Sequence, residues 1–291
     1  MKWSFNGEDS IMEWTFDTTS NASSQDDLEI LIAPDQNHDQ ELSKLPEQLP
    51  ILPLRGVVGY PQTVIPLTIG QHRSIRLVDD VASGDRMIGL LTAKDPELEN
   101  PGPDQLYEIG TAAIVHRLFR APDGTLRLLV QGMGRFRVTS FTAQEPYLQA
   151  KIETIPENED SGLEVEALAR NARDQFVHIA GMIPSIPREL VSSIAALDSP
   201  LLTVYTIANF QRMDLKDAQE ILELDSVADK LRLLVTILTR ESEVLELGQK
   251  IQNQARSEIE KVQREYFLRE QLKAIQNELG EKDEQAADIE D

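Results

Sequence analysis

Short apolar runs separated by turn residues fill the segment 49–155 and predict a β-rich domain. The runs that we expect to form strands are Ile51–Leu54, Val64–Leu67, Met87–Leu91, Ala112–Val115, Leu126–Val130, Phe136–Val138 and Tyr147–Ile155. Many short strands with close turns are typical of a small barrel or sandwich. Pro122-Asp123-Gly124-Thr125 predicts a hairpin, and Gly132 and Gly134 predict a bend or bulge. One helix is expected at Ser74–Ala82.

The hydrophobic period changes after the charged break Pro156–Gly162. Apolar residues between 163 and 183 recur at steps of three and four, which is the period of a helix. Four more short helices are expected at 187–197, 200–210, 215–223 and 227–240, with Ser199, Asp214 and Ser226 as N-cap residues. Together they predict a helical bundle at 163–240. The break predicts that this bundle and the β domain at 49–155 are separate folding units.

A long projecting helix is predicted at 241–280. The segment has no proline and a single internal glycine, Gly248, before its end, so an unbroken helix would be about 60 Å long. Its apolar stripe is thin, and a thin stripe is typical of a helix that pairs with another chain or element. The residues that we expect to form an assembly face are Ile259, Val262, Tyr266, Leu268, Leu272 and Ile275.

The pattern therefore predicts an α+β protein, and no catalytic chemistry can be assigned to its residues. The 291 residues include no cysteine, and the four histidines are scattered without metal-ligand spacing. No glycine is followed by lysine, which excludes a phosphate-binding loop. Ser257 and Lys261 are four residues apart on the predicted exposed helix, without the cleft that a nucleophile needs. We expect no cofactor and no metal in this chain.

Charge is concentrated at the two ends of the chain. The net charge is −22; residues 1–48 carry eleven acidic residues against two lysines, and residues 281–291 carry six against one. Nucleic acid and anionic membranes are therefore unlikely partners on electrostatic grounds. The leader, 1–48, is predicted to be disordered, although Trp3-Ser4-Phe5-Asn6 recurs as Trp14-Thr15-Phe16-Asp17. No membrane span or secretory signal is expected, so we predict a cytoplasmic protein.

Several segments resemble the amino-terminal half of the Lon family of ATP-dependent proteases. Leu52-Pro53-Leu54-Arg55 with Ile65-Pro66-Leu67 is similar to the opening strands of that family, and Lys94-Asp95-Pro96-Glu97 with Leu106–Thr111 is similar to its next signature. The most specific match is the run from Gln263 to Gly280. The resemblance covers 49–280. Gly56 departs from the Asp or Asn that the family commonly has, which predicts a looser first turn.

The resemblance implies a PUA-like fold for the β domain and a place before an AAA+ ATPase and a Ser–Lys protease domain. ATP, magnesium and the catalytic dyad are then expected only beyond residue 291. The chain itself is expected to bind unfolded or misfolded protein clients and to take part in a hexamer. Two other readings are a stand-alone Lon-N-domain adaptor, which the 263–280 segment argues against, and a PUA-type RNA-binding protein, which the acidic charge disfavours.

The predicted client contact is an apolar patch at Tyr60, Pro61 and Val64, in the loop between the first two strands. Proline spacing in this loop favours side chains that point outward, and unfolded clients share exposed apolar side chains. The alternative is that Tyr60 and Val64 pack in the core.

Overall fold

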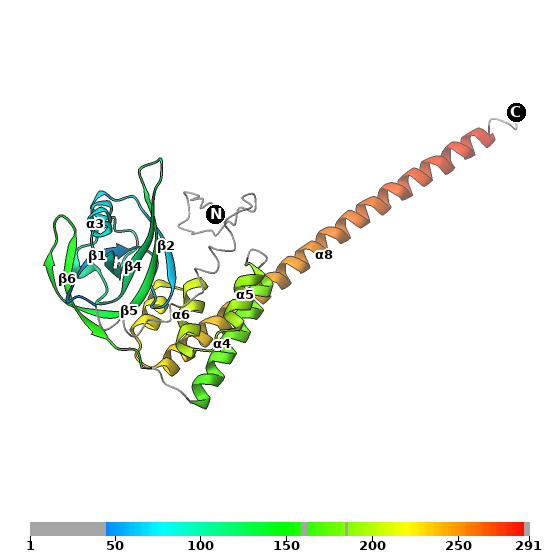
Figure 1. Ribbon diagram of the computed structural model, residues 1–291. Helices are drawn as coiled ribbons and strands as arrows, with labels where there is room; N and C mark the ends of the chain where they lie inside the picture. The colour runs from blue at the N-terminus through cyan, green and yellow to red at the C-terminus, as the bar shows by residue number, and fades with distance from the viewer. Residues whose placement is uncertain (1–44, 159–161, 184–185, 288–291) are drawn as a thin grey trace. The chain divides into compact units, whose positions relative to one another are not determined.

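The computed structural model describes residues 45–158, 162–183 and 186–287, and it shows a strand-rich part followed by helices (Figure 1). The predicted disorder of the leader and its repeated Trp motif lie outside the described residues. The α+β class predicted from the sequence is confirmed.

Six strands form a barrel-like sheet. They are β1 Gln48–Leu54, β2 Val64–Ile69, β3 Met87–Thr92, β4 Ile109–Arg120, β5 Leu126–Ala143 and β6 Leu148–Ile155. The order is β2-β5-β4-β3-β1-β6, and the second half of β5 also pairs with β6, which closes a ring of five strands. The strand β2 pairs with the first half of β5 and stays at the edge of the sheet. Only β1 and β3 are parallel.

A bulge explains why two predicted runs became one strand. In the β4–β5 ladder Ala112 lies opposite Gly134 and Ala113 lies opposite Gly132, so Met133 is the extra residue. A Cβ atom at Gly132 would overlap the carbonyl oxygen of Tyr60. The predicted bulge is confirmed, and glycine is needed there because two backbone segments touch.

The described strands carry two apolar clusters on their opposite faces. Leu52 and Leu90 belong to the cluster that α3, His72–Ala82, covers with Leu77 and Val78. The other cluster contains Ile51, on the opposite face of β1. Alternating burial on both faces is what a closed sheet requires.

Turn residues adopt the conformations that their types favour. The predicted hairpin turn at 122–125 joins β4 to β5, and Gly124 has φ of 84°. Gly56 has φ of 70°, in the left-handed region that Asn and Asp also tolerate. The position therefore accepts glycine without strain.

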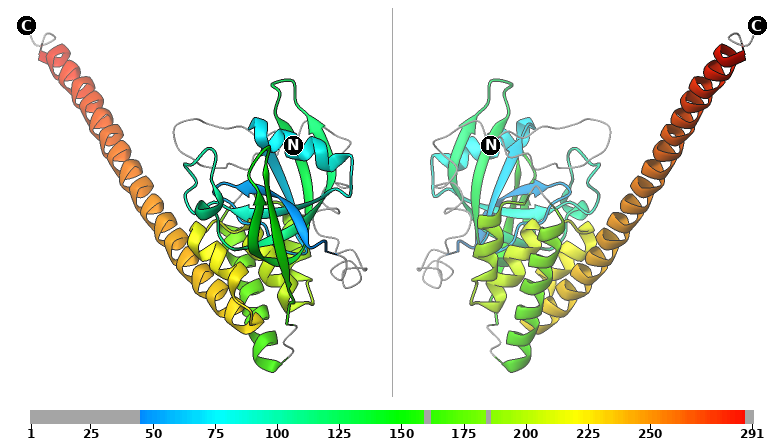
Figure 2. Two further views of the ribbon diagram at one scale, coloured as in Figure 1. Left: turned by 90° about the vertical axis from the view of Figure 1, so that its left-hand side faces the viewer. Right: turned by 90° about the vertical axis from the view of Figure 1, so that its right-hand side faces the viewer.

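Between β6 and α8, Val227–Ala287, the described residues form four helices, and their bounds are close to those predicted. They are α4 Leu163–Met182, α5 Arg188–Ala195, α6 Pro200–Phe210 and α7 Leu215–Glu223. Figure 2 shows α4, α5 and α6 lying side by side, in agreement with their contacts. The Ser199 hydroxyl accepts a hydrogen bond from Leu202 N at 3.2 Å, as an N-cap should. Asp214 occupies an N-cap position without a side-chain cap bond.

The helices expected at 227–240 and 241–280 join without a boundary between them. One helix, α8, runs from Val227 to Ala287, so the last bundle helix, the long helix and the start of the acidic tail are continuous. No proline interrupts these 61 residues, which correspond to about 90 Å of helix. The chain still divides into two compact units, Met1–Thr239 and Arg240–Asp291, inside this helix. Among the described residues, no helix combines the length and the apolar character that crossing a bilayer requires.

The expected separation at Pro156–Gly162 does not divide the chain into two compact units. The strands and the helices up to Thr239 belong to one unit. Tyr60, from the β1–β2 connection, donates a hydrogen bond to Ala218 O of α7 at 2.9 Å, and Gln219 Nε2 donates to Ile109 O of β4 at 2.9 Å. Buried bonds between strands and helices make the two parts one packed body.

Candidate functional site

The three residues predicted to contact clients are buried. Tyr60 is 1% exposed and Val64 is 6% exposed, and Pro61 is also buried. The Tyr60 ring stacks on that of Tyr205 with centroids 5.7 Å apart. The predicted exposed patch is therefore wrong, and the alternative of core packing is right. The loop is drawn inward because Thr111 Oγ1 donates to Gly59 O at 2.6 Å and Gly132 allows the close backbone contact.

An exposed face instead lies on the far side of the β4–β5 hairpin. Val115, Leu126, Leu128 and Val130 point into the core, so their neighbours in sequence point away from it. On this outer face Phe119 pairs with Arg127, and Arg117 pairs with Leu129. The edge strand β2 continues the face, with Thr68 beside Arg127 and Pro66 beside Leu129. We call these six residues the outer face.

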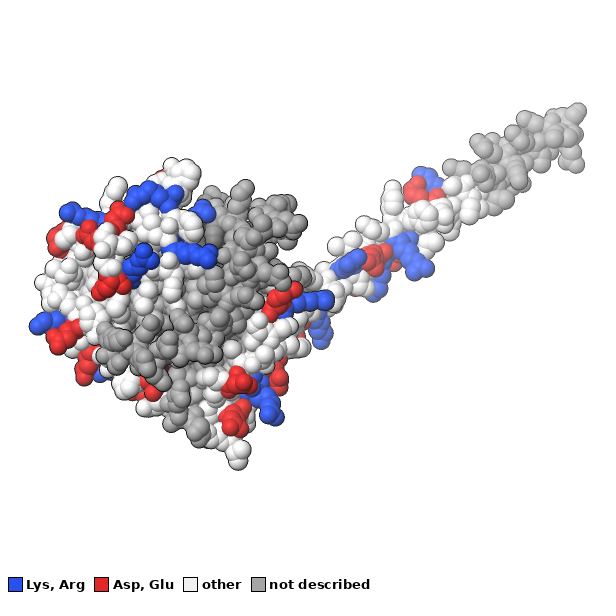
Figure 3. Space-filling model, in the orientation of Figure 1, with Lys and Arg blue, Asp and Glu red and all other residues white. Residues whose placement is uncertain are grey.

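The outer face is both apolar and basic. Phe119 is 60% exposed, and it is the only large hydrophobic residue of the described β domain with such exposure. Pro66 and Leu129, which pair in the neighbouring row of the face, are half-buried. The strand segments 64–69, 113–120 and 126–131 contain no Asp or Glu, in a chain of net charge −22. Figure 3 shows Lys and Arg side chains over the upper part of this domain, where the hairpin projects in Figure 1.

One carboxylate lies at the tip of the hairpin. Asp123 Oδ1 accepts hydrogen bonds from the Thr125 hydroxyl at 2.7 Å and from Thr125 N at 2.9 Å. These bonds, with a smaller contribution from the charge of Arg127, lower the pKa of Asp123. The Asp123 carboxylate is therefore ionised, and its hydrogen bonds to Thr125 hold it within the turn. The two strands that flank the turn remain basic.

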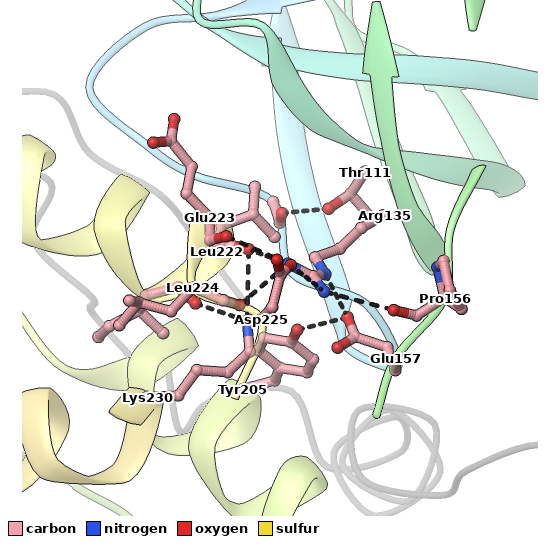
Figure 4. A network of polar contacts seen from close by, with 12 residues as sticks. Thr111, Arg135, Pro156, Glu157, Tyr205, Leu222, Glu223, Leu224, Asp225 and Lys230 are labelled. Atoms are coloured by element: carbon pink, nitrogen blue, oxygen red, sulfur yellow. Dashed lines mark hydrogen bonds and ion pairs between the residues drawn. The ribbon is translucent and has the colours of Figure 1, made fainter. Parts of the chain in front are cut away.

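A buried arginine connects the barrel to the helices (Figure 4). The Arg135 side chain of β5 is 0% exposed, and its Nε forms an ion pair with Glu157 Oε1 at 2.8 Å. Its Nη1 donates to the carbonyls of Leu222 at 3.0 Å and Leu224 at 2.9 Å, at the C-terminal end of α7. Its Nη2 lies 3.2 Å from Asp225 Oδ1. A cation at this end also complements the helix dipole.

Lys230 is a second buried cation at the same helix end. Its Nζ donates to Ile221 O at 2.8 Å and to Leu222 O at 3.3 Å, and it lies 5.1 Å from the centroid of the Tyr205 ring. Burial, followed by repulsion from Arg135, lowers the pKa of Lys230 to about 7, although Glu157 and Asp225 oppose that shift. The Tyr205 hydroxyl donates to Glu157 Oε1 at 2.5 Å, and burial raises the pKa of Tyr205.

This cluster is structural support, and few features of the sequence point to it. Arg135 follows Gly132 and Gly134, which predicted only a bend or bulge, and its partners at the end of α7 are 87 to 89 residues away. The available signal was an arginine inside an otherwise buried strand pattern. The cluster fixes α7 and the start of α8 to β5.

The predicted assembly face on α8 is exposed. Ile259, Val262 and Tyr266 are 58%, 64% and 68% exposed, and Leu268, Leu272 and Ile275 are 54%, 56% and 57% exposed. Side chains on the rest of this stretch are exposed as well. Among the described residues, no group of three or more His, Cys, Asp or Glu side chains is placed to hold a metal ion.

A small closed sheet packed against helices defines an α+β domain of the LON substrate-binding class. Residues 48–240 match the model of the ATP-dependent protease La (LON) substrate-binding domain. The chain belongs to this Lon family, as an N-terminal segment.

Relatives support the same assignment. The Lon protease of Dictyoglomus thermophilum is 46% identical over 245 residues, covering 84% of this chain and 31% of that protein. Lon protease 1 of Herpetosiphon aurantiacus is 44% identical over 254 residues, covering 86% of this chain and 31% of its own length. The chain thus spans about a third of the curated relatives it matches. The N-terminal domain of Mycobacterium avium complex Lon protease has the same fold, with a TM-score of 0.54, 20% identity, and coverage of 66% of this chain and 98% of that one.

Proposed function

We propose that this chain recognises unfolded or misfolded protein clients for a Lon-type protease and that the outer face is the contact surface. The observation that carries the proposal is Phe119, 60% exposed opposite Arg127, with Leu129 and Pro66 in the neighbouring row of the same face. Unfolded segments share exposed apolar side chains, and a solvent-exposed aromatic residue beside half-buried apolar neighbours suits them. The flanking Arg117 and Arg127 favour clients that also carry acidic residues.

The catalytic residues of the proposed protease are expected in another part of the longer protein. No phosphate-binding loop or activated nucleophile occurs in this sequence, so ATP, magnesium and a Ser–Lys dyad are proposed to act beyond residue 291, in the cytoplasm. A single small apolar site should bind weakly, with Kd of about 10–100 μM. Six linked copies would raise avidity by orders of magnitude. The acidic net charge supports a protein client over RNA.

Replacing Phe119 by serine should weaken client binding about tenfold, because a buried Phe side chain contributes about 1.5–3 kcal/mol. Leu129→Ser should act in the same direction with a smaller effect. Fluorescence anisotropy of a labelled, permanently unfolded casein-like client measures both. Leu163→Ser is the matched control, since Leu163 is 87% exposed on α4, and it should leave binding unchanged. Equal affinities of F119S and the unsubstituted chain would refute the outer face as the client site.

We further propose that α8 takes part in assembly, as a hexamer in the longer protein. The specific observation is that ten large apolar side chains of this helix are each more than half exposed; they are Val244, Leu247, Ile251, Ile259, Val262, Tyr266, Phe267, Leu268, Leu272 and Ile275. A helix with such a stripe gains most of its stability from a partner.

Leu268→Glu combined with Leu272→Glu should therefore abolish concentration-dependent association of the chain. Sedimentation equilibrium between micromolar and 100 micromolar protein measures it. Gln271→Glu combined with Glu270→Gln, which leaves the net charge and the apolar stripe unchanged, is the control. If the unsubstituted chain is monomeric across this range, assembly through α8 alone is rejected.

A further inference from the structure

One glycine stands in the long helix α8 without a local structural need for it. Gly248 is the single glycine of residues 227–276 in this helix. A Cβ atom placed at Gly248 would meet no atom within 4 Å, whereas one at Gly132 would overlap a carbonyl oxygen. Its φ also lies outside the positive range that favours glycine. Neither packing against the described residues nor backbone conformation therefore requires glycine at this position.

Glycine weakens the helix around this position. Inside a helix it is less favourable than alanine, because its backbone loses more conformational freedom on folding. The difference corresponds to about fivefold in the equilibrium between closed and open backbone hydrogen bonds. Gly248 is exposed, as are the side chains at 246 and 247 and from 249 onward, so few side-chain contacts offset this loss. The hydrogen bonds that span Gly248 should therefore open more readily than those of the following turns.

Gly248 lies just past the point where packing of α8 ends. Leu234 and Leu238 are buried in the first part of the helix. Leu245 is half-buried, and every described side chain from 246 to 276 is exposed. A helix that is held at one end and free beyond it bends most easily just past its last support. Gly248 is three residues past Leu245, in the first turn that lacks such support.

The helix beyond Gly248 has the features of a stiff segment. Residues 249–276 contain neither glycine nor proline. Arg256 Nε forms an ion pair with Glu260 Oε1 at 3.2 Å, and Lys261 Nζ lies 3.7 Å from Glu258 Oε1. Pairs at spacings of three and four residues support a helix. Bending is therefore expected at the glycine rather than along the segment that follows it.

We propose that Gly248 is a hinge in α8, about which residues 249–276 turn as one rigid segment. The hinge opens the few backbone hydrogen bonds that span Gly248, and it removes no side chain from a core. The proposal goes beyond the client and assembly roles proposed above, and it depends on neither of them. A hinge at this position gives the apolar stripe beyond it a range of directions relative to the turn at 240–247.

Distances between two spin labels on α8 test the proposal in the full chain. The protein has no cysteine, so Arg240→Cys and Gln263→Cys, at exposed positions, provide the two labelling sites. The 23 residues between them span about 35 Å in an unbent helix. Double electron–electron resonance, with an excess of unlabelled chain that suppresses distances between copies, should show this distance and a second, shorter population. Gly248→Ala should lower the shorter population about fivefold.

Gln249→Ala is the matched control, because Gln249 is the exposed neighbour of the hinge. Glutamine and alanine differ in helix propensity by a factor of about two or less, so the shorter population should fall by no more than that factor. Equal distance distributions in G248A and in the chain that keeps Gly248 would overturn the hinge. A single population at about 35 Å in the chain that keeps Gly248 would overturn it as well.

Hydrogen exchange separates a hinge from unfolding of the whole distal helix. The amides of residues 249–252 have their hydrogen-bond acceptors at 245–248, so these bonds span the hinge. Gly248→Ala should slow exchange of these amides about fivefold and leave the exchange of residues 256–270 unchanged. Slowing of both stretches by the same factor would show that the helix beyond Leu245 opens as a unit, and the hinge would then be rejected.

Discussion

Arg135→Met is expected to lower the free energy of unfolding by about 3–5 kcal/mol, the range for removing one member of a buried ion pair. The substitution leaves Glu157, whose side chain is 9% exposed, without its cation. It also leaves the carbonyl of Leu224 without its Arg135 donor and the carbonyl of Leu222 with Lys230 Nζ alone, at 3.3 Å, and unpaired buried polar groups are costly. Urea unfolding followed by far-ultraviolet circular dichroism gives the difference.

Two variants separate the ion pair from simple loss of volume. Arg137→Met, on the same strand and exposed, should change stability by less than about 0.5 kcal/mol. Adding Glu157→Gln to Arg135→Met should recover part of the loss, because the uncompensated carboxylate is removed while an oxygen remains for Tyr205. A loss in R135M no larger than in R137M would show that the cluster does not hold the helices to the barrel.

Stability of the unsubstituted chain is expected to rise between pH 7 and pH 10, and Lys230 is the cause. Burial and the nearby Arg135 lower the pKa of Lys230 to about 7 in the folded chain, whereas a lysine in the unfolded chain has pKa near 10.4. Between these values the unfolded state binds the proton and the folded state does not. The free energy of unfolding therefore increases with pH, by at most about 1.4 kcal/mol per unit.

Groups around Lys230 set the limits of this window. Glu157 and Asp225 oppose the shift, so they set the lower end of the pH window, which would extend below pH 7 without them. In the folded chain, burial raises the pKa of Tyr60 and Tyr205. Above pH 10 the tyrosines of the unfolded chain therefore lose their protons first, and the free energy of unfolding falls.

Lys230→Met should remove the rise in stability between pH 7 and pH 10, while the exposed Lys216→Met should retain it. A rise of equal slope in K230M would assign the effect to other groups.

The local pattern of residue types was sufficient to predict most of the helices and strands. The turn at 122–125, the strands at its two sides and the helix starting at Pro200 follow from residue types within a few positions. Ser199 acts as the predicted cap because the bond it forms is local. The bulge at Met133 was foreseen because two glycines in a strand pattern have few other uses.

Contacts between residues that are far apart in the sequence explain the predictions that were wrong. Tyr60 and Val64 were assigned to a surface because the loop was considered without α6 and α7, which cover Tyr60. The same long-range packing joins the β domain to the helices across the charged break. The continuity of α8 through residue 240 was not predicted. The apolar side chains of this helix are buried before residue 240 and exposed after it, whereas its backbone remains helical throughout. The outer face was missed because Phe119 is visible as exposed only once the register of β4 is known.

The bonds of Arg135 also set an order of events during folding. They join residues 87 to 89 positions apart, and such closure is entropically favourable only after the intervening strands and helices have formed. The guanidinium is therefore desolvated late, on the native side of the transition state. Interactions of that kind slow unfolding more than they speed folding. The cluster thus lowers the unfolding rate, which lengthens the lifetime of the folded domain without accelerating its formation.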